Sequence, residues 1–273
     1  MDSHLDVSRL LAAGFVARVE HYAALDSTQQ RAREAAANPF EPLPLLVVAD
    51  RQSAGRGRGD NSWWTGEGNL ALSLLFDPAQ LGCPRGLPSM SLAASVAIID
   101  AITSLWEGAW DGFPKPSAGN RRLGLHWPND VFVADRKLGG VLIEALPDGL
   151  HILGIGLNTN SRVADAPAEL QPQLTTLRDL TGRPHDHTEL TLALMDQLVA
   201  CLNQLGADPQ SLGRRFDELC LQHGQTLTLY QGDRATTGRC LGIAPDGGLI
   251  LETPSGQQSF HSGTLQPPRG AVQ

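Results

Sequence analysis

The chain has 273 residues, of which 41% are hydrophobic and 18% are charged, and its formal net charge is −8. This length is enough for one large domain, or for a large domain and a small one. An acidic chain lacks the broad basic face on which binding to a nucleic-acid backbone depends, and no apolar run approaches the length of a transmembrane helix, so we expect neither DNA nor a membrane as a partner.

The cysteines and the first residues of the chain bear on its compartment. The four cysteines are scattered, without a CxxC pair or zinc-ligand spacing: Cys83, Cys201, Cys220 and Cys240. Neither a disulfide framework nor a structural metal is therefore expected. The N-terminal residues lack the basic and apolar regions of a signal peptide. These features predict reduced thiols and a cytoplasmic protein.

Apolar patterns divide the first half of the chain into an amphipathic segment, three strands and a helix. In chain order these lie at residues 7–13, 15–22, 45–49, 70–76 and 88–106. The next stretch, residues 111–120, is rich in glycine, proline and serine. It predicts a surface insertion.

The second half predicts four strands, two helices and then a change of texture. The strands lie at 123–127, 131–133, 137–144 and 150–157, and the helices at 189–205 and 209–222. Four short strands separated by Gly and Asp turns follow at 226–230, 235–243, 248–252 and 257–261. We expect an α/β domain over residues 1–223 and a small β-barrel over 224–273. The alternative is that the short strands extend the main sheet.

A glycine-rich loop with two arginines follows the predicted strand at 45–49. The guanidinium groups of Arg56 and Arg58 are planar forks of donors suited to carboxylate or phosphate. The glycines around them let the backbone approach a ligand closely. Such a loop can stay disordered when empty and fold over an anion. On an acidic chain it favours a small anionic ligand, although alone it is more typical of a solvated basic turn.

A second group of polar residues lies on and after a predicted hairpin. Pro128 ends a strand, so Asn129 and Asp130 can project from its end into a site. Lys137 follows across a tight turn and can face the same cavity. Each feature alone is more typical of an ordinary turn or a solvated lysine. The P-loop and dinucleotide-binding spacings are missing, so a nucleotide would be bound by another architecture.

Five motifs, in order, resemble those of the biotin–protein ligases. They occupy residues 26–30, 52–58, 127–130, 137–140 and 154–158. The resemblance implies an α/β (α+β) fold, with a mixed-sheet catalytic domain similar to class II aminoacyl-tRNA synthetases and a C-terminal SH3-like barrel. It also implies a ligase that uses ATP and Mg²⁺ to convert biotin to biotinyl-5'-AMP. The biotinyl group would pass to a lysine in the biotin carboxyl carrier domain of acetyl-CoA carboxylase or a related enzyme.

The same resemblance implies roles for individual residues. Lys137 and Arg58 would be catalytic, with Arg58 in the loop that closes over the adenylate. The biotin and adenylate side would comprise Ser27, Thr28, Gln29, Gln52, Arg56, Gly57, Arg58, Trp63, Lys137, Gly139 and Gly140. The nucleotide and metal side would comprise Asn69, His126, Asn129, Asp130 and Asn158. Mg²⁺ would be held mainly through the phosphates of ATP, with no direct protein ligand assigned.

The chain departs from the family pattern at three places. His126 stands where lysine is usual, residues 59–62 lack further arginines, and Gln29 stands where asparagine is common. Imidazole titrates near pH 6.5, so a histidine at position 126 offers a positive charge to the phosphates only when it is protonated. We therefore expect the use of ATP to depend on pH.

Few residues precede the strand at 15–22, so we expect the monofunctional form of the ligase, without a DNA-binding domain. The sequence leaves open whether this form is a homodimer. Two alternatives remain for the activity. A lipoate–protein ligase shares the fold, but its Arg-Arg-x-x-Gly-Gly-Gly signature is missing from the chain. A catalytically degenerate biotin-binding module is the remaining alternative.

Overall fold

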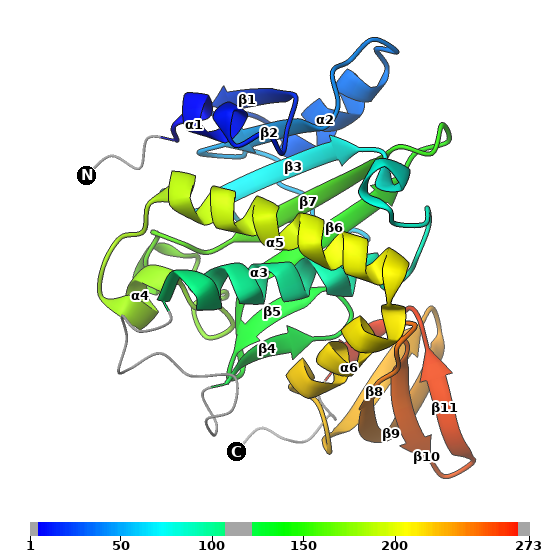
Figure 1. Cartoon of the computed structure of the whole chain (residues 1–273). Helices are drawn as coiled ribbons and strands as arrows, with labels where there is room; N and C mark the ends of the chain where they lie inside the picture. The colour runs from blue at the N-terminus through cyan, green and yellow to red at the C-terminus, as the bar shows by residue number, and fades with distance from the viewer. Residues whose placement is uncertain (1–4, 107–121, 267–273) are drawn as a thin grey trace.

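The computed structural model describes residues 5–106 and 122–266, so the insertion predicted at 111–120 lies outside the described residues. Two sheets organise the chain: a large one whose face is covered by long helices, and a small C-terminal one beside the end of the helical layer (Figure 1).

The large sheet has seven strands in the spatial order β1-β2-β3-β7-β6-β5-β4. Their bounds are β1 (Arg18–Tyr22), β2 (Leu45–Ala49), β3 (Leu70–Phe76), β4 (Leu123–His126), β5 (Asp130–Val133), β6 (Arg136–Ala145) and β7 (His151–Leu157). Only β1 and β2 are parallel; every other neighbouring pair is antiparallel. The predicted mixed sheet is therefore confirmed. Because β7 lies between β3 and β6, residues distant in sequence meet at the centre of the sheet.

Long helices cover one face of this sheet, with α5 crossing over α3 in Figure 1. The long helices are α3 (Met90–Trp106) and α5 (His187–Ala207), and the shorter α1 (Val7–Ala12), α4 (Leu177–Thr181) and α6 (Pro209–Leu219) pack into the same core. Most residues of α3 are buried because the helix lies between the sheet and α5. The apolar periodicities thus located both long helices, each within two residues of its observed start.

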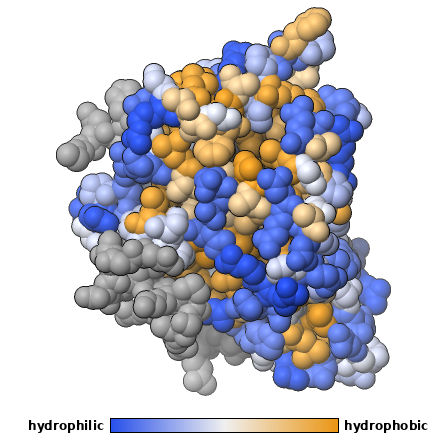
Figure 2. Space-filling model, viewed as in Figure 1, coloured by the Kyte–Doolittle hydropathy of each residue, from blue (hydrophilic) through white to orange (hydrophobic). Residues whose placement is uncertain are grey.

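Within the described residues, α5 is the one helix long and apolar enough to cross a membrane by length and composition alone. Its leucines instead pack into the core: Leu190, Leu194, Leu198, Leu202 and Leu205. Hydrophilic side chains lie over the middle of the helical face in Figure 2. These features are those of a core helix with one solvated side.

The helix α2 (Thr28–Ala36) was not predicted as a helix. Its signal was present, because Ser27 followed by Gln30 matches the N-terminal capping pattern, and the Ser27 hydroxyl accepts a hydrogen bond from the Gln30 amide. Ala32 and Ala35 pack against β2, β3 and β7. The N-terminus of α2 consequently points its first side chains toward the centre of the sheet.

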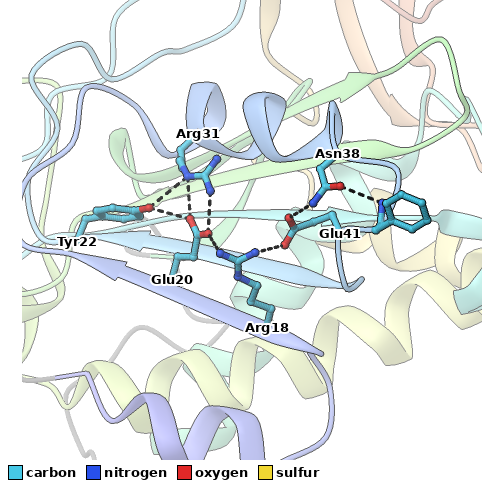
Figure 3. A network of polar contacts seen from close by, with 7 residues as sticks. Arg18, Glu20, Tyr22, Arg31, Asn38 and Glu41 are labelled. Carbon is cyan, nitrogen blue, oxygen red and sulfur yellow. Dashed lines mark hydrogen bonds and ion pairs between the residues drawn. The ribbon is translucent and has the colours of Figure 1, made fainter.

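A network of charged side chains ties α2 to the edge strand β1 (Figure 3). The Glu20 carboxylate accepts hydrogen bonds from Arg18 at 2.6 Å, from Arg31 at 2.8 and 2.9 Å, and from the Tyr22 hydroxyl at 2.9 Å. Arg18 also donates to Glu41 at 2.7 Å. Only 9% of the Glu20 side chain is exposed, so these bonds are largely shielded from water.

Replacing Glu20 by Gln is expected to lower the free energy of unfolding by about 1.5–3 kcal/mol, because the charge-assisted bonds to two arginines are lost. The matched control is Glu252→Gln. Glu252 pairs with Arg239 at 2.9 Å, but both side chains are more than half exposed, so its loss is expected to cost less than about 1 kcal/mol. Urea unfolding of both variants checks this, and equal losses would contradict the structural role of the network.

The C-terminal sheet is antiparallel, with the order β11-β10-β9-β8-β12. Its strands are β8 (Thr226–Gln231), β9 (Arg234–Ile243), β10 (Leu249–Thr253), β11 (Gly256–Phe260) and β12 (Thr264–Gln266). The four predicted strands are confirmed, whereas the three-residue β12 was not predicted. The two sheets share no strand among the described residues, so the short strands do not extend the main sheet. All four cysteines are free and buried.

Candidate active site

A cavity of about 390 Å³ lies at the N-terminus of α2, over β3, β7 and β6. Its volume is in the usual range for a small-molecule site. The structure brings together all but two of the predicted site residues along its wall: Ser27, Thr28, Gln29, Gln52, Arg56, Gly57, Arg58, Trp63, His126, Asn129, Asp130, Lys137, Gly140 and Asn158. The five sequence motifs therefore converge on one cavity.

One end of the cavity is polar but carries no charged side chain. The backbone N–H of Thr28 donates to Gln52 Oε1 at 2.8 Å, and the Thr28 hydroxyl donates to the same oxygen at 3.2 Å. Gln52 Nε2 in turn donates to the Thr65 hydroxyl at 3.1 Å. The Ser73 hydroxyl lies 2.9 Å from that of Thr28. Neutral donors and acceptors at this end suit an uncharged polar ligand group.

The glycine–arginine loop forms a short hairpin, in which Arg56 and Ser62 are bridged. Gly57 N–H donates to Asn61 at 2.8 Å, and Trp63 N–H donates to Gly55 at 2.8 Å. The side chain of Arg58 donates to the backbone carbonyl of Gly263, which precedes β12. The loop therefore reaches across to the C-terminal sheet.

Two arginines of this loop have different surroundings. Burial lowers the pKa of Arg58, an effect that the charge of Asp130 partly opposes; the guanidinium nonetheless stays protonated. Arg56 lies 3.7 Å from the Glu144 carboxylate, which also pairs with Arg33 of α2. A half-buried cation such as Arg58 gains from an anionic ligand, because the protein has already removed much of its water.

Lys137 and Asp130 face the same cavity, as the hairpin geometry predicted. Lys137 Nζ lies 2.8 Å from Asp130 Oδ1 and 5.4 Å from the centre of a Trp63 ring. About a third of the lysine side chain is exposed. The ammonium group is thus held between a carboxylate and an aromatic face while remaining open to a ligand.

Glycines on β6 and β7 make the floor of the cavity. A Cβ at Gly140 would approach the Lys137–Asp130 pair, one at Gly154 would approach Gln29, and one at Gly156 would overlap Trp63. Gly140 and Gly156 are paired across the two strands. The missing side chains provide the space that these cavity residues occupy.

The side of the cavity near β4 and β5 carries a histidine. The His126 ring stacks on Phe132, with centroids 4.4 Å apart and an angle of 19°. Burial lowers the pKa of His126, and Lys137 lowers it further, whereas Asp130 partly opposes the shift. The imidazole is therefore neutral at pH 7.

Two predicted site residues do not line the cavity. Asn69 is buried behind Asn158 and donates to Asn158 Oδ1 at 3.1 Å, while its own oxygen accepts from the Ser161 hydroxyl at 2.7 Å. At Gly139 a Cβ would meet Leu157 of β7, so this glycine serves strand packing. Asn69 therefore reaches the cavity only through Asn158, which lines it.

The sequence assigned no role to the other lining residues: Asn61, Ser62, Trp64, Leu72, Ser73, Trp127, Pro128, Val141, Leu142, Gly154, Ile155, Gly156, Leu170, Gln173, Leu174, Thr264 and Leu265. Of these, Trp127, Pro128 and the residues 154–156 belong to the five motifs. Ser73 had a signal, because it is the one polar residue in an otherwise apolar buried strand. Leu174 and Leu265 had none, since tertiary packing alone brings them to the wall.

The lining also defines what metal the cavity could hold. Asp130 is the one carboxylate among the lining residues that the structure describes. No group of three His, Cys, Asp or Glu side chains suited to a metal occurs within residues 5–106 and 122–266. This donor set fits a cation such as Mg²⁺, which is commonly bound by one or two carboxylates together with substrate phosphates.

Comparisons with known proteins agree with this geometry. Residues 22–160 match the Biotin/lipoate A/B protein ligase family, and residues 223–265 match the Biotin protein ligase C terminal domain. The bifunctional ligase/repressor BirA of Bacillus subtilis (strain 168) is 31% identical over 254 residues, which cover 89% of this chain and 71% of BirA.

In two further similar proteins, the match covers most of the other protein's own length. The biotin–[acetyl-CoA-carboxylase] ligase of Paracoccus denitrificans is 28% identical over 220 residues, 78% of this chain and 85% of that protein. The solved biotin protein ligase from Aquifex aeolicus in complex with biotin and ATP superposes with a TM-score of 0.76 at 27% identity. This match covers 92% of this chain and 98% of that one.

Proposed function

This chain belongs to the Biotin/lipoate A/B protein ligase family, and we propose that the cavity at the N-terminus of α2 is where it activates biotin. The protein is a biotin–protein ligase, which activates biotin and transfers it to protein. The observation that carries the assignment of the site is the distribution of charge in one cavity. Lys137 and two loop arginines line one part of it, and neutral polar side chains line another.

In the first half-reaction the biotin carboxylate attacks the α-phosphorus of ATP, and pyrophosphate leaves. Negative charge builds on the phosphoryl oxygens as the bond forms, and fixed donors stabilise it. Lys137 contacts the biotin carboxylate and the α-phosphate, exchanging its contact with Asp130 for the ligand. Arg58 lies over the same region from the loop. In the second half-reaction a carrier lysine amine attacks the biotinyl carbonyl, and AMP leaves.

The ureido ring of biotin occupies the polar end of the cavity. It has two N–H donors and one carbonyl acceptor, which matches a neutral site made of Ser27, Thr28 and Gln52. The dithiolane ring of lipoate offers none of these groups and would leave buried polar atoms unpaired. A site built around hydrogen bonds rejects a ligand that lacks them more strongly than an apolar site rejects an extra methylene.

The nucleotide occupies the side near Asn129, Asp130 and Asn158. Asp130 is the residue that would hold Mg²⁺ together with the phosphates, and the cation would neutralise phosphate charge when bound. Asn69 supports this side through Asn158 rather than by contact with the ligand.

The chain divides into a catalytic unit and a C-terminal unit. Residues 1–223 form the catalytic unit, and residues 224–273 form an SH3-like unit whose Thr264 and Leu265 close one wall of the cavity. The protein partner is a biotin carboxyl carrier domain of acetyl-CoA carboxylase, in line with the substrate named for the Paracoccus relative. We place the enzyme in the cytoplasm, where its free buried thiols stay reduced.

Transfer of labelled biotin to a carrier domain in the presence of ATP tests this function, with labelled lipoate as the parallel substrate. Incorporation of biotin alone supports the proposal. Incorporation of lipoate instead would assign the chain to the lipoate branch of the family. Biotin binding without incorporation would identify a degenerate binding module.

Replacing His126 by Lys is expected to tighten binding of a non-hydrolysable ATP analogue about tenfold at pH 8, because a charged donor then faces the phosphates. Because burial lowers the pKa of His126, the native ring becomes protonated only below the usual range of imidazole, and the difference between the two proteins shrinks as the pH falls through that lowered pKa. Calorimetric titration across this range measures it. The exposed His223→Lys is the control, and a His126→Lys profile equal to that of wild type would place the ring away from the phosphates.

A further inference from the structure

The turn that joins β4 to β5 leads into the nucleotide side of the cavity. It comprises residues 127–129, and Asp130 follows it directly. His126 and Asp130 pair across the turn, so the path of the turn decides where Asn129 and Asp130 lie. Trp127 is its first residue and is only 1% exposed. Because the turn is so short, a shift of Trp127 moves the residues that follow.

The later part of this turn is held by the large sheet and by α3. The Asn129 side chain donates to the backbone carbonyl of Val141, and the Val141 N–H donates to the Asn129 carbonyl at 2.9 Å. The Ser91 hydroxyl of α3 lies 3.4 Å from the Pro128 carbonyl. These contacts fix residues 128 and 129, whereas Trp127 is fixed by other parts of the chain.

Trp127 is held by two residues that do not belong to the cavity lining. Its backbone N–H donates to Gln222 Oε1 at 2.9 Å, and its indole Nε1 donates to the Gly247 carbonyl at 3.0 Å. Gln222 is 1% exposed and lies between α6 and β8. Gly247 lies in the turn between β9 and β10 of the C-terminal sheet. Both bonds are buried, so each donor of Trp127 depends on its protein partner.

The β9–β10 turn is seated firmly against the helical layer. Gly247 has a φ of +87°, in the left-handed region, and a Cβ there would lie 3.0 Å from Ser89, just before α3. Pro245 of the same turn packs on Gly213 of α6, where a Cβ would overlap the proline. The Gly247 N–H donates to the Ala244 carbonyl at 2.9 Å. The Gly247 carbonyl therefore has a fixed position from which to hold the indole.

We infer that Trp127 is a positioning residue through which hydrogen bonds made outside the cavity set the geometry of its nucleotide side. Gln222 and Gly247 hold Trp127 in place. Asn129 and Asp130 follow Trp127 in the chain and take their positions from it. This inference rests on the proposed function, in which the nucleotide lies beside these two residues. The polar end of the cavity is held by neither bond, so the effect falls on the nucleotide and not on biotin.

Gln222→Met is expected to weaken binding of a non-hydrolysable ATP analogue up to about tenfold, the value of one hydrogen bond. Methionine keeps the volume of the side chain but leaves the Trp127 N–H without its acceptor. Trp127→Phe keeps an aromatic ring at this position, removes the indole N–H and is expected to weaken the analogue to a similar extent. The affinity for biotin is expected to be unchanged in both variants. Calorimetric titration of each ligand separately measures this difference.

Asp217→Ala is the matched control. Asp217 Oδ1 accepts a hydrogen bond from the Ile243 N–H at 3.1 Å, so it also ties α6 to β9, but this bond involves no residue of the β4–β5 turn. Its loss is expected to leave both affinities unchanged. An equal effect of Asp217→Ala on the ATP analogue would show a general loosening of the C-terminal sheet and would overturn the role of Trp127.

Equal weakening of biotin and the analogue by Gln222→Met would show a merely structural role and overturn the inference, as would an unchanged affinity for the analogue. Weakening by Trp127→Phe alone would assign the effect to direct contact with the ligand and would also overturn it. Thermal unfolding of the variants confirms that folded protein is compared. Failure of wild-type protein to bind the analogue would overturn the placement of the nucleotide in the proposed function. Normal binding that is indifferent to both substitutions would overturn only this inference.

Discussion

Lys137→Ala is expected to slow formation of biotinyl-AMP about 10²–10³-fold, the usual loss when one donor to a developing oxyanion is removed. Lys137 lies in the cavity, 2.8 Å from Asp130 Oδ1, and it is close to the glycine floor formed by Gly140. Its charge acts mainly as the phosphoryl charge develops, so the loss falls on the rate of the chemical step. Biotin binding through the polar end of the cavity is retained.

Two further variants show whether the loss in Lys137→Ala is due to the charge of Lys137 itself. Arg136→Ala removes an adjacent exposed cation on the same hairpin and is expected to leave the rate unchanged. Lys137→Met removes the charge but keeps much of the side-chain volume, so a loss equal to that of Lys137→Ala belongs to the charge rather than to packing. Rapid-quench measurement of adenylate formation separates these cases. A wild-type rate in Lys137→Ala would mean that another group does the work.

Arg58→Ala is expected to raise the release rate of biotinyl-AMP about 10- to 100-fold, corresponding to the loss of a charge-assisted hydrogen bond. Arg58 links the loop to the Gly263 carbonyl beside the C-terminal sheet and is half-buried at the cavity wall. Without it, the loop loses both an anchor and its attraction to the adenylate. The closed loop then makes fewer contacts that can offset the backbone entropy lost when the loop becomes ordered.

The consequence is measured as biotin transfer to an unrelated bystander protein, with the carrier domain omitted. Arg239→Ala, which removes an exposed arginine on β9, is the control for a general loss of positive charge. Adenylate synthesis continues in Arg58→Ala because Lys137 is untouched. Unchanged bystander labelling, with adenylate formation verified, would count against Arg58 as the residue that retains the intermediate.

Local patterns were enough to predict most of the fold. The buried strands β2 and β3 coincide with the predicted runs at 45–49 and 70–76, because a strand buried on both faces is continuously apolar. The predicted strand at 15–22 starts three residues later, at Arg18. Helix α2 was missed because its first residues were interpreted as a binding motif, although they also cap the helix.

The site was predictable where a motif carried the chemistry, and less so where tertiary contacts decide. The hairpin placed Lys137 and Asp130 together, as its short turn requires. Nothing in the local sequence shows that Asn69 faces Asn158 instead of the cavity, or that Arg58 reaches Gly263 more than 200 residues later. The ordered hairpin of the arginine loop likewise depends on contacts that only the folded chain provides.

The most direct test of the account is whether the purified protein, given biotin and ATP labelled at the α-phosphate but no carrier, forms labelled biotinyl-AMP. We predict a protein-bound labelled adenylate that requires biotin, does not form with lipoate, and is nearly abolished by Lys137→Ala. Absence of the adenylate in wild-type protein, or its formation with lipoate in place of biotin, would contradict the account.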